Sequence, residues 1–242
     1  NMIFDKIKKL PIIICFSFFI PNVSLAENLR LKSFGHSSFL IKGGGQSVLL
    51  NPFKSIGCTA GLDEINNEKF DFILASSRLS DEGYNPNNHL MFAESGVYKI
   101  NRIILNGIKI PHDRYGGKRF GMATVWIWKQ NNFKIVHMGG AAGKININNN
   151  ILLTRPDVLF ISVGGGPKSY NGKEAAEIVN GLKPKIIIPV HFLTDNNKDY
   201  ECEFSDESLF LDSVRGFKVV YVDETFEIKQ KNLSENIIYI FK

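Results

Sequence analysis

The stretch Asp71-Phe-Ile-Leu-Ala-Ser-Ser-Arg-Leu-Ser-Asp-Glu-Gly83 decides the fold of this chain. Its apolar first part, Phe72 to Ala75, is typical of a short buried strand, and the polar part that begins at Ser76 predicts the loop after that strand. In open α/β sheets, ligands bind at the carboxyl ends of the strands. We therefore expect a functional site at the loop from Ser76 to Gly83.

Five other strings are apolar runs joined to polar or small residues, and their order along the chain is informative. They are Gly35-His-Ser-Ser-Phe-Leu-Ile41, Val48-Leu-Leu-Asn51-Pro-Phe53, Ile110-Pro-His112-Asp113, Ile135-Val-His137-Met-Gly-Gly140 and Ile186-Ile-Ile-Pro-Val-His191. Each string alone is common by chance. Together, from about Leu31 to Thr194, they resemble the metallo-β-lactamase superfamily, and most closely its hydrolase-like branch that includes ascorbate-phosphate lactonases.

The resemblance implies an α+β fold, a four-layer αββα sandwich of two sheets with helices outside, and the residue patterns agree with it. Helical spacing of apolar residues predicts a helix over Gly172 to Leu182 with Asn171 as its N-cap, and a second helix is expected over Ser205 to Asp212. Strands are expected at Leu29–Phe34, Ser38–Lys42, Ser47–Asn51, Ala123–Lys129, Phe133–Met138, Asp157–Val163, Lys185–Val190, Lys218–Val222, Thr225–Ile228 and Ile237–Phe241. The first three predict an antiparallel meander, Ala123–Lys129 and Phe133–Met138 a hairpin, and the last three late strands or a hairpin.

The metal motif of the family is largely missing from this chain. The family's strand ends in His-x-His-x-Asp-His, whereas this chain has Ser77-Arg-Leu-Ser-Asp-Glu82 at the same offset. The resemblance places Ser77, Leu79 and His112 at the first metal site, where a catalytic zinc needs three donors and leucine has no lone pair. Gly140 stands where the family has its metal-bridging aspartate, so the ordinary two-zinc site is not expected.

The resemblance places Asp81, Glu82 and His191 at the second metal site, and all three side chains carry donor atoms. Two carboxylates and one imidazole suit a single zinc, manganese or iron ion. Such an ion lowers the pKa of bound water and polarises a carbonyl or phosphoryl oxygen. One hypothesis is therefore a single-metal hydrolase of a small ester, lactone or phosphodiester, with His112 as base or further donor.

The alternative is a metal-free pseudoenzyme that binds an anionic small molecule. In that reading Arg78 supplies the positive charge once given by metal and pairs with Asp81, while His112 or His191 completes a polar network. Asn51, Arg114 and His137 would line the ligand pocket, and the neighbouring cations Lys118 and Arg119 are either further anion contacts or solvated loop charges.

Three other features have simpler readings. His36 is expected to be a satisfied packing histidine and not a ligand, and the Gly164–Lys168 loop resembles a phosphate cradle only loosely because no helix follows directly. Ser76 and Ser77 lack the nucleophile elbow of serine hydrolases, so a covalent mechanism requires Ser77 to lie within hydrogen-bond reach of His112 or His191.

Residues 1–26 have the layout of a secretory signal peptide: three lysines, an apolar run, and small residues that end at Ala26. We expect export to a periplasm or equivalent lumen, contact with a membrane only if this segment stays uncleaved, and one domain over residues 27–242. The net charge of +5 is spread along the chain and not gathered in basic runs, which argues against nucleic acid as a partner. Cys58 and Cys202 would remain after cleavage, either as a disulfide or as two thiols.

Overall fold

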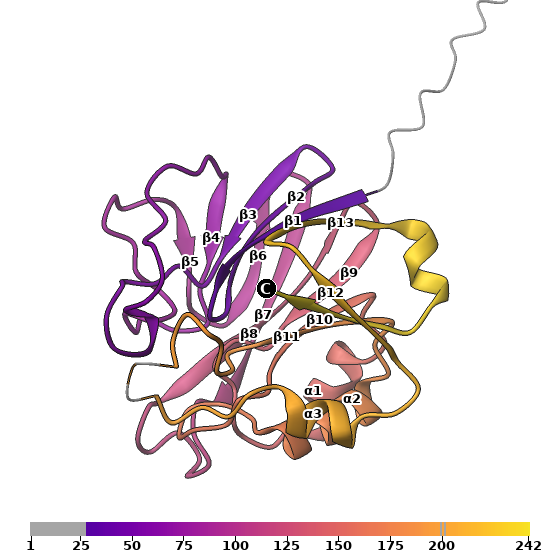
Figure 1. Cartoon of the computed structure of the whole chain (residues 1–242). Coiled ribbons are helices and arrows are strands. Elements are labelled where there is room, and N and C mark those ends of the chain that lie inside the picture. The colour runs from indigo at the N-terminus through magenta and orange to yellow at the C-terminus, as the bar shows by residue number, and fades with distance from the viewer. Residues whose placement is uncertain (1–27, 199, 201) are drawn as a thin grey trace, which may run out of the picture.

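Two β-sheets stacked face to face form the body of the molecule (Figure 1). This computed structural model describes residues 28–198, 200 and 202–242. The predicted signal peptide therefore lies outside the described residues. Within them, no helix combines the length and apolar character needed to cross a bilayer.

The first sheet has six strands in the order β13-β1-β2-β3-β4-β5. The first three strands form the predicted antiparallel meander, β3, β4 and β5 run parallel, and β13 from the far end of the chain pairs antiparallel with β1. Their bounds are β1 Asn28–Gly35, β2 Ser38–Gly43, β3 Gln46–Leu50, β4 Phe72–Leu74, β5 Met91–Phe92 and β13 Thr225–Lys229.

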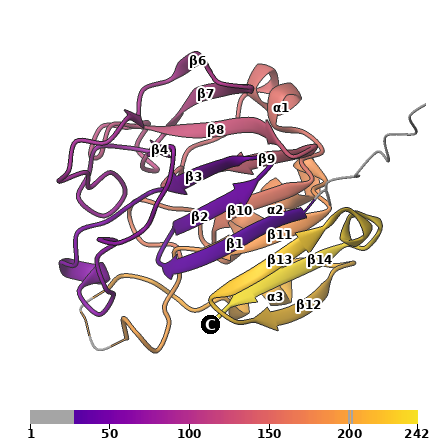
Figure 2. The same cartoon turned by 90° about the horizontal axis from the view of Figure 1, so that it is seen from above.

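The second sheet has eight strands in the order β12-β14-β11-β10-β9-β8-β7-β6. The predicted hairpin is β8 and β9, whereas the alternative of a late hairpin is wrong, because β12 and β13 belong to different sheets. Figure 2 shows these late strands in yellow beside β1 and β11. The bounds are β6 Gly96–Ile100, β7 Ile103–Pro111, β8 Met122–Gln130, β9 Phe133–His137, β10 Val158–Ser162, β11 Ile186–Val190, β12 Lys218–Val222 and β14 Ile237–Phe241.

Side-chain alternation divides each strand between two apolar layers. In β10, Val158 and Phe160 face the core between the sheets, while Leu159 and Ile161 face the helices. The helices α1 (Ile147–Leu153), α2 (Gly172–Leu182) and α3 (Ser208–Ser213) cluster on this outer face of the eight-stranded sheet (Figure 1). The 3₁₀ helices are η1 (Gly57–Thr59) and η2 (Gln230–Ser234).

The two-sheet sandwich is confirmed, with one difference in its outer layers. The outer face of the six-stranded sheet carries a small cluster that includes Leu40, Leu49 and Ile73, and Ile65 and Phe70 from the loop before β4 pack against it. Within the described part of the chain, loop residues thus cover this face in place of a second helical layer.

Helix α2 begins and ends as its sequence predicts. The Asn171 side chain accepts a hydrogen bond from the Glu174 amide, and the Glu174 side chain accepts one from the Asn171 amide, which completes a capping box. Lys183 ends the helix in a left-handed conformation. The helix fixes the segment that follows β10, which carries two residues of the candidate site.

Candidate functional site

The candidate site lies at one edge of the sandwich, where β3, β4, β9, β10 and β11 end. Three residues there have left-handed backbone conformations: His36 at φ 55°, Asn51 at φ 40° and His191 at φ 56°. Non-glycine residues rarely adopt this conformation, and such strain concentrates at functional sites. The His191 amide donates a 2.8 Å hydrogen bond to the His36 carbonyl, which holds these two histidines together across the sheets.

His36, Asp81 and His191 form a cluster with the donor geometry of a metal site. One ligand atom from each residue lies within 4.8 Å of the other two, and the two imidazole rings meet edge to face at 4.1 Å. Among the described residues, neither ring nitrogen of His36 has a hydrogen-bond partner, although the ring is buried. The expectation that His36 is a satisfied packing histidine is therefore wrong.

The tautomer of His191 follows from the bonds of Ser169. The Ser169 hydroxyl donates its one proton to the Gly165 carbonyl, so it can only accept from His191 Nδ1 at 2.9 Å. Nδ1 of His191 therefore carries the proton and Nε2 keeps its lone pair. Nε2 is buried and has no partner in the described structure, so it is free to bind a cation.

The electrostatics of both histidines favour the neutral, ligating form. Burial lowers the pKa of His36 to about 4. Burial, followed by the neighbouring His36, lowers the pKa of His191 well below its ordinary value. Both imidazoles are thus uncharged at neutral pH, as a metal ligand must be.

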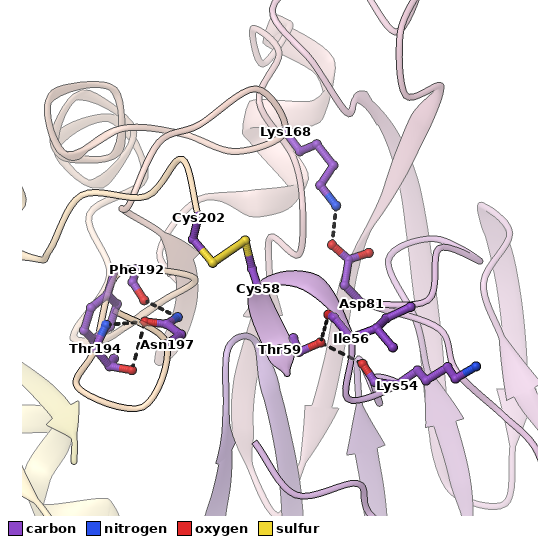
Figure 3. The surroundings of a disulfide bond; sticks show 10 residues. All are labelled: Lys54, Ile56, Cys58, Thr59, Asp81, Lys168, Phe192, Thr194, Asn197 and Cys202. Carbon is purple, nitrogen blue, oxygen red and sulfur yellow. Dashed lines mark hydrogen bonds and ion pairs between the residues drawn. A yellow bond between two sulfur atoms is a disulfide. The ribbon is translucent and has the colours of Figure 1, made fainter. Parts of the chain in front are cut away.

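Lys168 reaches the third member of this cluster and forms an ion pair with Asp81 (Figure 3). The two side chains are only 19% and 20% exposed, so water screens the pair less than it would a surface pair. Arg114 holds the loop that carries Lys168: its guanidinium donates to the Gly166 carbonyl, to the Ser169 carbonyl at 2.8 Å and to Glu174. Arg114 thus shapes the site wall from outside.

Glu82 belongs to a separate network beside the cluster. Its fully buried carboxylate accepts hydrogen bonds from the Ser76 hydroxyl at 2.6 Å and the Ser77 hydroxyl at 3.0 Å, and lies 3.2 Å from His112 Nε2. Burial opposes its charge, but the charge of His112 and the bonds from His112 and Ser76 outweigh this, so the pKa of Glu82 lies below its usual range. His112 Nε2 is therefore the donor to Glu82, and its Nδ1 has no partner in the described chain.

The backbone at Gly140 lies directly against this pair. A Cβ at that position would lie 2.1 Å from His112 Nε2 and 2.2 Å from Glu82 Oε1. A side chain at position 140 and the Glu82–His112 contact therefore exclude one another. The absence of a side chain at Gly140 therefore makes room for the glutamate.

Asn51 and His137 support the site from beneath. The Asn51 amide group donates to the Ser76 hydroxyl at 2.9 Å and to the Ser37 hydroxyl at 3.1 Å, and its oxygen accepts from the Ser76 amide at 2.8 Å. His137 Nε2 lies 3.2 Å from the Ser37 carbonyl, and burial lowers the pKa of His137 to about 4. Both residues are buried and fix the loops at the strand ends.

The structure separates several residues that the sequence placed together. Arg78 does not neutralise Asp81, because its side chain is 63% exposed and pairs with Glu94 at 3.2 Å. Glu82 bonds to His112 and two serines, and the residue grouped with Asp81 and His191 is His36 instead. Among the described residues, Ser77 bonds to Glu82 and not to His112 or His191, the contact that a serine mechanism requires.

Sequence reasoning missed the roles of Lys168 and Ser169. In the sequence, Gly164–Lys168 resembles only a weak phosphate-binding motif. No signal in the sequence identified Ser169 as the partner of His191. For His36, the histidine directly after Gly35 at a strand turn was a usable signal, since such a turn can require a left-handed residue.

A disulfide closes the rim of the site. Cys58 in η1 bonds to Cys202, which lies beyond β11, so of the two alternatives the bridge is the one that forms. Figure 3 shows the bridge beside the Lys168–Asp81 contact. In the loop after His112, the Asp113 carboxylate accepts bonds from four backbone amides, at Tyr115, Gly117, Arg119 and Phe120.

Comparisons with known proteins agree with this architecture. A family model described as a beta-lactamase superfamily domain matches residues 30–191. A UPF0173 protein of Pyrococcus abyssi is 25% identical over 189 residues, which cover 69% of this chain and 84% of that protein.

Solved structures share the fold. A candidate zinc-dependent hydrolase of the metallo-β-lactamase superfamily from Thermotoga maritima superposes with a TM-score of 0.70 at 21% identity, over 88% of this chain and 98% of that one. A candidate metal-dependent hydrolase from Parabacteroides distasonis gives a TM-score of 0.53 at 15% identity, over 76% and 87% of the two chains. By its family match and its two-sheet architecture, this chain belongs to the metallo-β-lactamase superfamily.

Proposed function

We propose that the chain is a hydrolase that works with one divalent metal ion held by His36, Asp81 and His191. The observation that carries the proposal is the convergence of these three donors within 4.8 Å, with buried nitrogens of two histidines that have no hydrogen-bond partner among the described residues. Two imidazoles and one carboxylate are a ligand set that catalytic zinc and non-haem iron sites use. Zinc, manganese and iron are the ions to test.

The roles of the protein residues follow from their bonds. Ser169 directs His191 Nε2 into the cluster by accepting from Nδ1. When bound, a divalent ion supplies a water of lowered pKa and polarises the scissile carbonyl or phosphoryl group. Glu82 fixes the ring of His112 through Nε2 and leaves Nδ1 as the atom that takes or returns a proton. A small ester, lactone or phosphodiester is the substrate class that this chemistry serves.

A second candidate function rests on a different observation. The Lys168 ammonium already neutralises Asp81, and Glu82 with its three donors fills the neighbouring space. Such a site needs no metal for charge balance. The chain would then be a metal-free protein that binds an anionic small molecule.

Metal reconstitution separates the two functions. The purified chain is incubated with zinc, manganese or iron, freed of excess ion and analysed for metal, beside His36→Ala and His89→Ala, a control at an exposed loop histidine. The hydrolase proposal predicts one ion per chain, lost in His36→Ala and kept in His89→Ala. A chain that holds no stoichiometric ion would refute it and favour the anion binder.

We also propose that the protein is exported. The leader-like pattern of residues 1–26 supports this location, and so does the Cys58–Cys202 bridge, because disulfides persist in oxidising compartments. A fusion of residues 1–40 to a reporter enzyme that is active only outside the cytoplasm tests the proposal. A reporter that stays inactive would contradict export.

A further inference from the structure

The feature that the proposed function leaves unexplained is the cation already in contact with one of its ligands. Lys168 is the only ion-pair partner found for Asp81 among the described residues, and the pair is mostly buried. A loop lysine without a specific contact would extend into water, because its four-carbon side chain is flexible and its ammonium is strongly hydrated. The surrounding loop instead directs it into the site.

The loop is held on both sides of Lys168. Arg114 binds the carbonyls of Gly166 and Ser169, and the Ser169 hydroxyl bonds both to Gly165 and to His191. The residue that sets the tautomer of His191 therefore directly follows the residue that neutralises Asp81. The same loop therefore orients His191 for binding a metal ion and places the Lys168 ammonium on Asp81, where it competes with that ion.

The Lys168 ammonium cannot remain in contact with Asp81 when a metal ion binds there. A divalent ion bound by Asp81 would lie within a few ångströms of the ammonium, and two like charges repel strongly in a partly dry site. The carboxylate can compensate only one of them fully. The lysine stem can turn while the loop that carries it stays in place.

Outside the cluster, a second cation lies near the same aromatic ring as Lys168. The Lys168 ammonium lies 5.8 Å from the centre of the Phe120 ring, and the Arg119 guanidinium lies 4.8 Å from the same ring. The Phe120 ring is also 6.3 Å from that of His112. After release from Asp81, the Lys168 ammonium and the Arg119 guanidinium would lie together near Phe120 and His112.

We propose that Lys168 and the metal ion exchange at Asp81, and that the displaced Lys168 then binds an anionic group of the substrate. This inference rests on the proposed single-metal function and narrows its substrate class to esters that carry a carboxylate or phosphate group near the scissile bond. Metal loading and substrate recognition are thereby coupled, because the ammonium is free for an anion only when the metal has taken its place.

Metal affinity measured without any substrate tests the exchange. Zinc and manganese are titrated into the purified, disulfide-bonded chain and into Lys168→Met, Lys168→Arg and Lys118→Met, the last a control at an exposed lysine of the opposite loop. Loss of the competing charge should tighten binding about tenfold or more in Lys168→Met, whereas Lys168→Arg and Lys118→Met should bind like wild type. Thermal melts check that each variant is folded.

Each pattern of affinities has one meaning. Equal affinity in wild type and Lys168→Met would overturn the exchange but leave the single-metal function standing. Binding by Lys168→Met alone would mean that the lysine has replaced the metal, which supports the competition and refutes the hydrolase. No binding by any variant would refute both.

A second titration tests the anion contact and its chemistry. Metal-loaded wild type should bind phenyl phosphate or benzoate about tenfold more tightly than metal-loaded Lys168→Met does, because a direct contact with the charge of a lysine is lost. The probe with the larger difference identifies phosphate or carboxylate as the group recognised. Equal affinities of the two loaded proteins for both probes would refute a role of Lys168 in substrate binding.

Discussion

Replacing Glu82 with glutamine tests the network that fills the site beside the metal cluster. The Glu82 and His112 side chains are both completely buried, and the carboxylate has three side-chain donors. Breaking a buried, hydrogen-bonded pair by removing its charged partner costs about 3–5 kcal/mol. For a chain of this size each kcal/mol lowers the melting temperature by about 2–4 °C. We therefore expect Glu82→Gln to melt about 6–20 °C below wild type at pH 7.

The matched control is Glu94→Gln, which removes the same charge from an exposed pair. Glu94 and Arg78 are 67% and 63% exposed, and such surface pairs contribute about 0–1 kcal/mol. Circular dichroism or calorimetry with reversible unfolding gives both melting temperatures. A Glu82→Gln protein that melts as Glu94→Gln does would refute the claim that this carboxylate is ionised and structurally necessary.

The stability difference between wild type and Glu82→Gln should depend on pH in one direction. The pKa of Glu82 is lowered in the folded protein, so the stability from its charge is present above the unfolded value of about 4.3 and is lost as pH falls toward the folded value. The stability difference between wild type and Glu82→Gln should therefore be full at pH 6–7 and shrink as pH falls below about 4. A difference that grows on acidification would contradict the assignment.

Three further predictions concern the surroundings of the site. Gly140→Ala should lower the free energy of unfolding by about 1–3 kcal/mol through overpacking against His112, whereas Gly181→Ala, in an open position on α2, should raise it by about 0.5–1 kcal/mol. Urea unfolding measures both variants, and equal effects would contradict the close approach at Gly140. Four backbone donors lower the pKa of Asp113 to about 2 against the opposing effect of burial, so its carboxyl carbon should titrate near pH 2 in NMR spectra, and a midpoint near 4 would contradict the bonding. Replacing both Cys58 and Cys202 with serine opens a link between residues 144 positions apart and should lower stability by about 2–5 kcal/mol in chemical denaturation; an unchanged midpoint would exclude a stabilising role for the bridge.

Much of the fold was predictable because the strands that make the core are apolar runs of regular length. Helix α2 was predicted with its exact bounds, because apolar spacing and a capping asparagine agree there. Strands β6 and β7 were missed: β6 alternates between exposed and half-buried positions, so no continuous apolar run marks it. The split of the last strands between two sheets was also not predictable, because nothing local to Lys218–Val222 or Thr225–Ile228 determines which sheet edge each one joins.

The candidate site was only partly predictable, for a related reason. Asp81 and His191 were recognised from strings that match the family, and they do converge. The neighbour that completes the cluster, His36, depends on a backbone bond between distant segments and on a left-handed turn. Lys168 and Arg78 have the same charge, and only the path of each loop decides that Lys168 turns inward while Arg78 turns to Glu94.

The most direct test of the proposed metal centre is an anomalous-scattering crystal structure of the chain grown with zinc or manganese. We expect one ion, in contact with His36, Asp81 and His191, and Lys168 turned away from the carboxylate. Two ions bridged across the Glu82 and His112 side, or no ion at these three residues, would contradict the account.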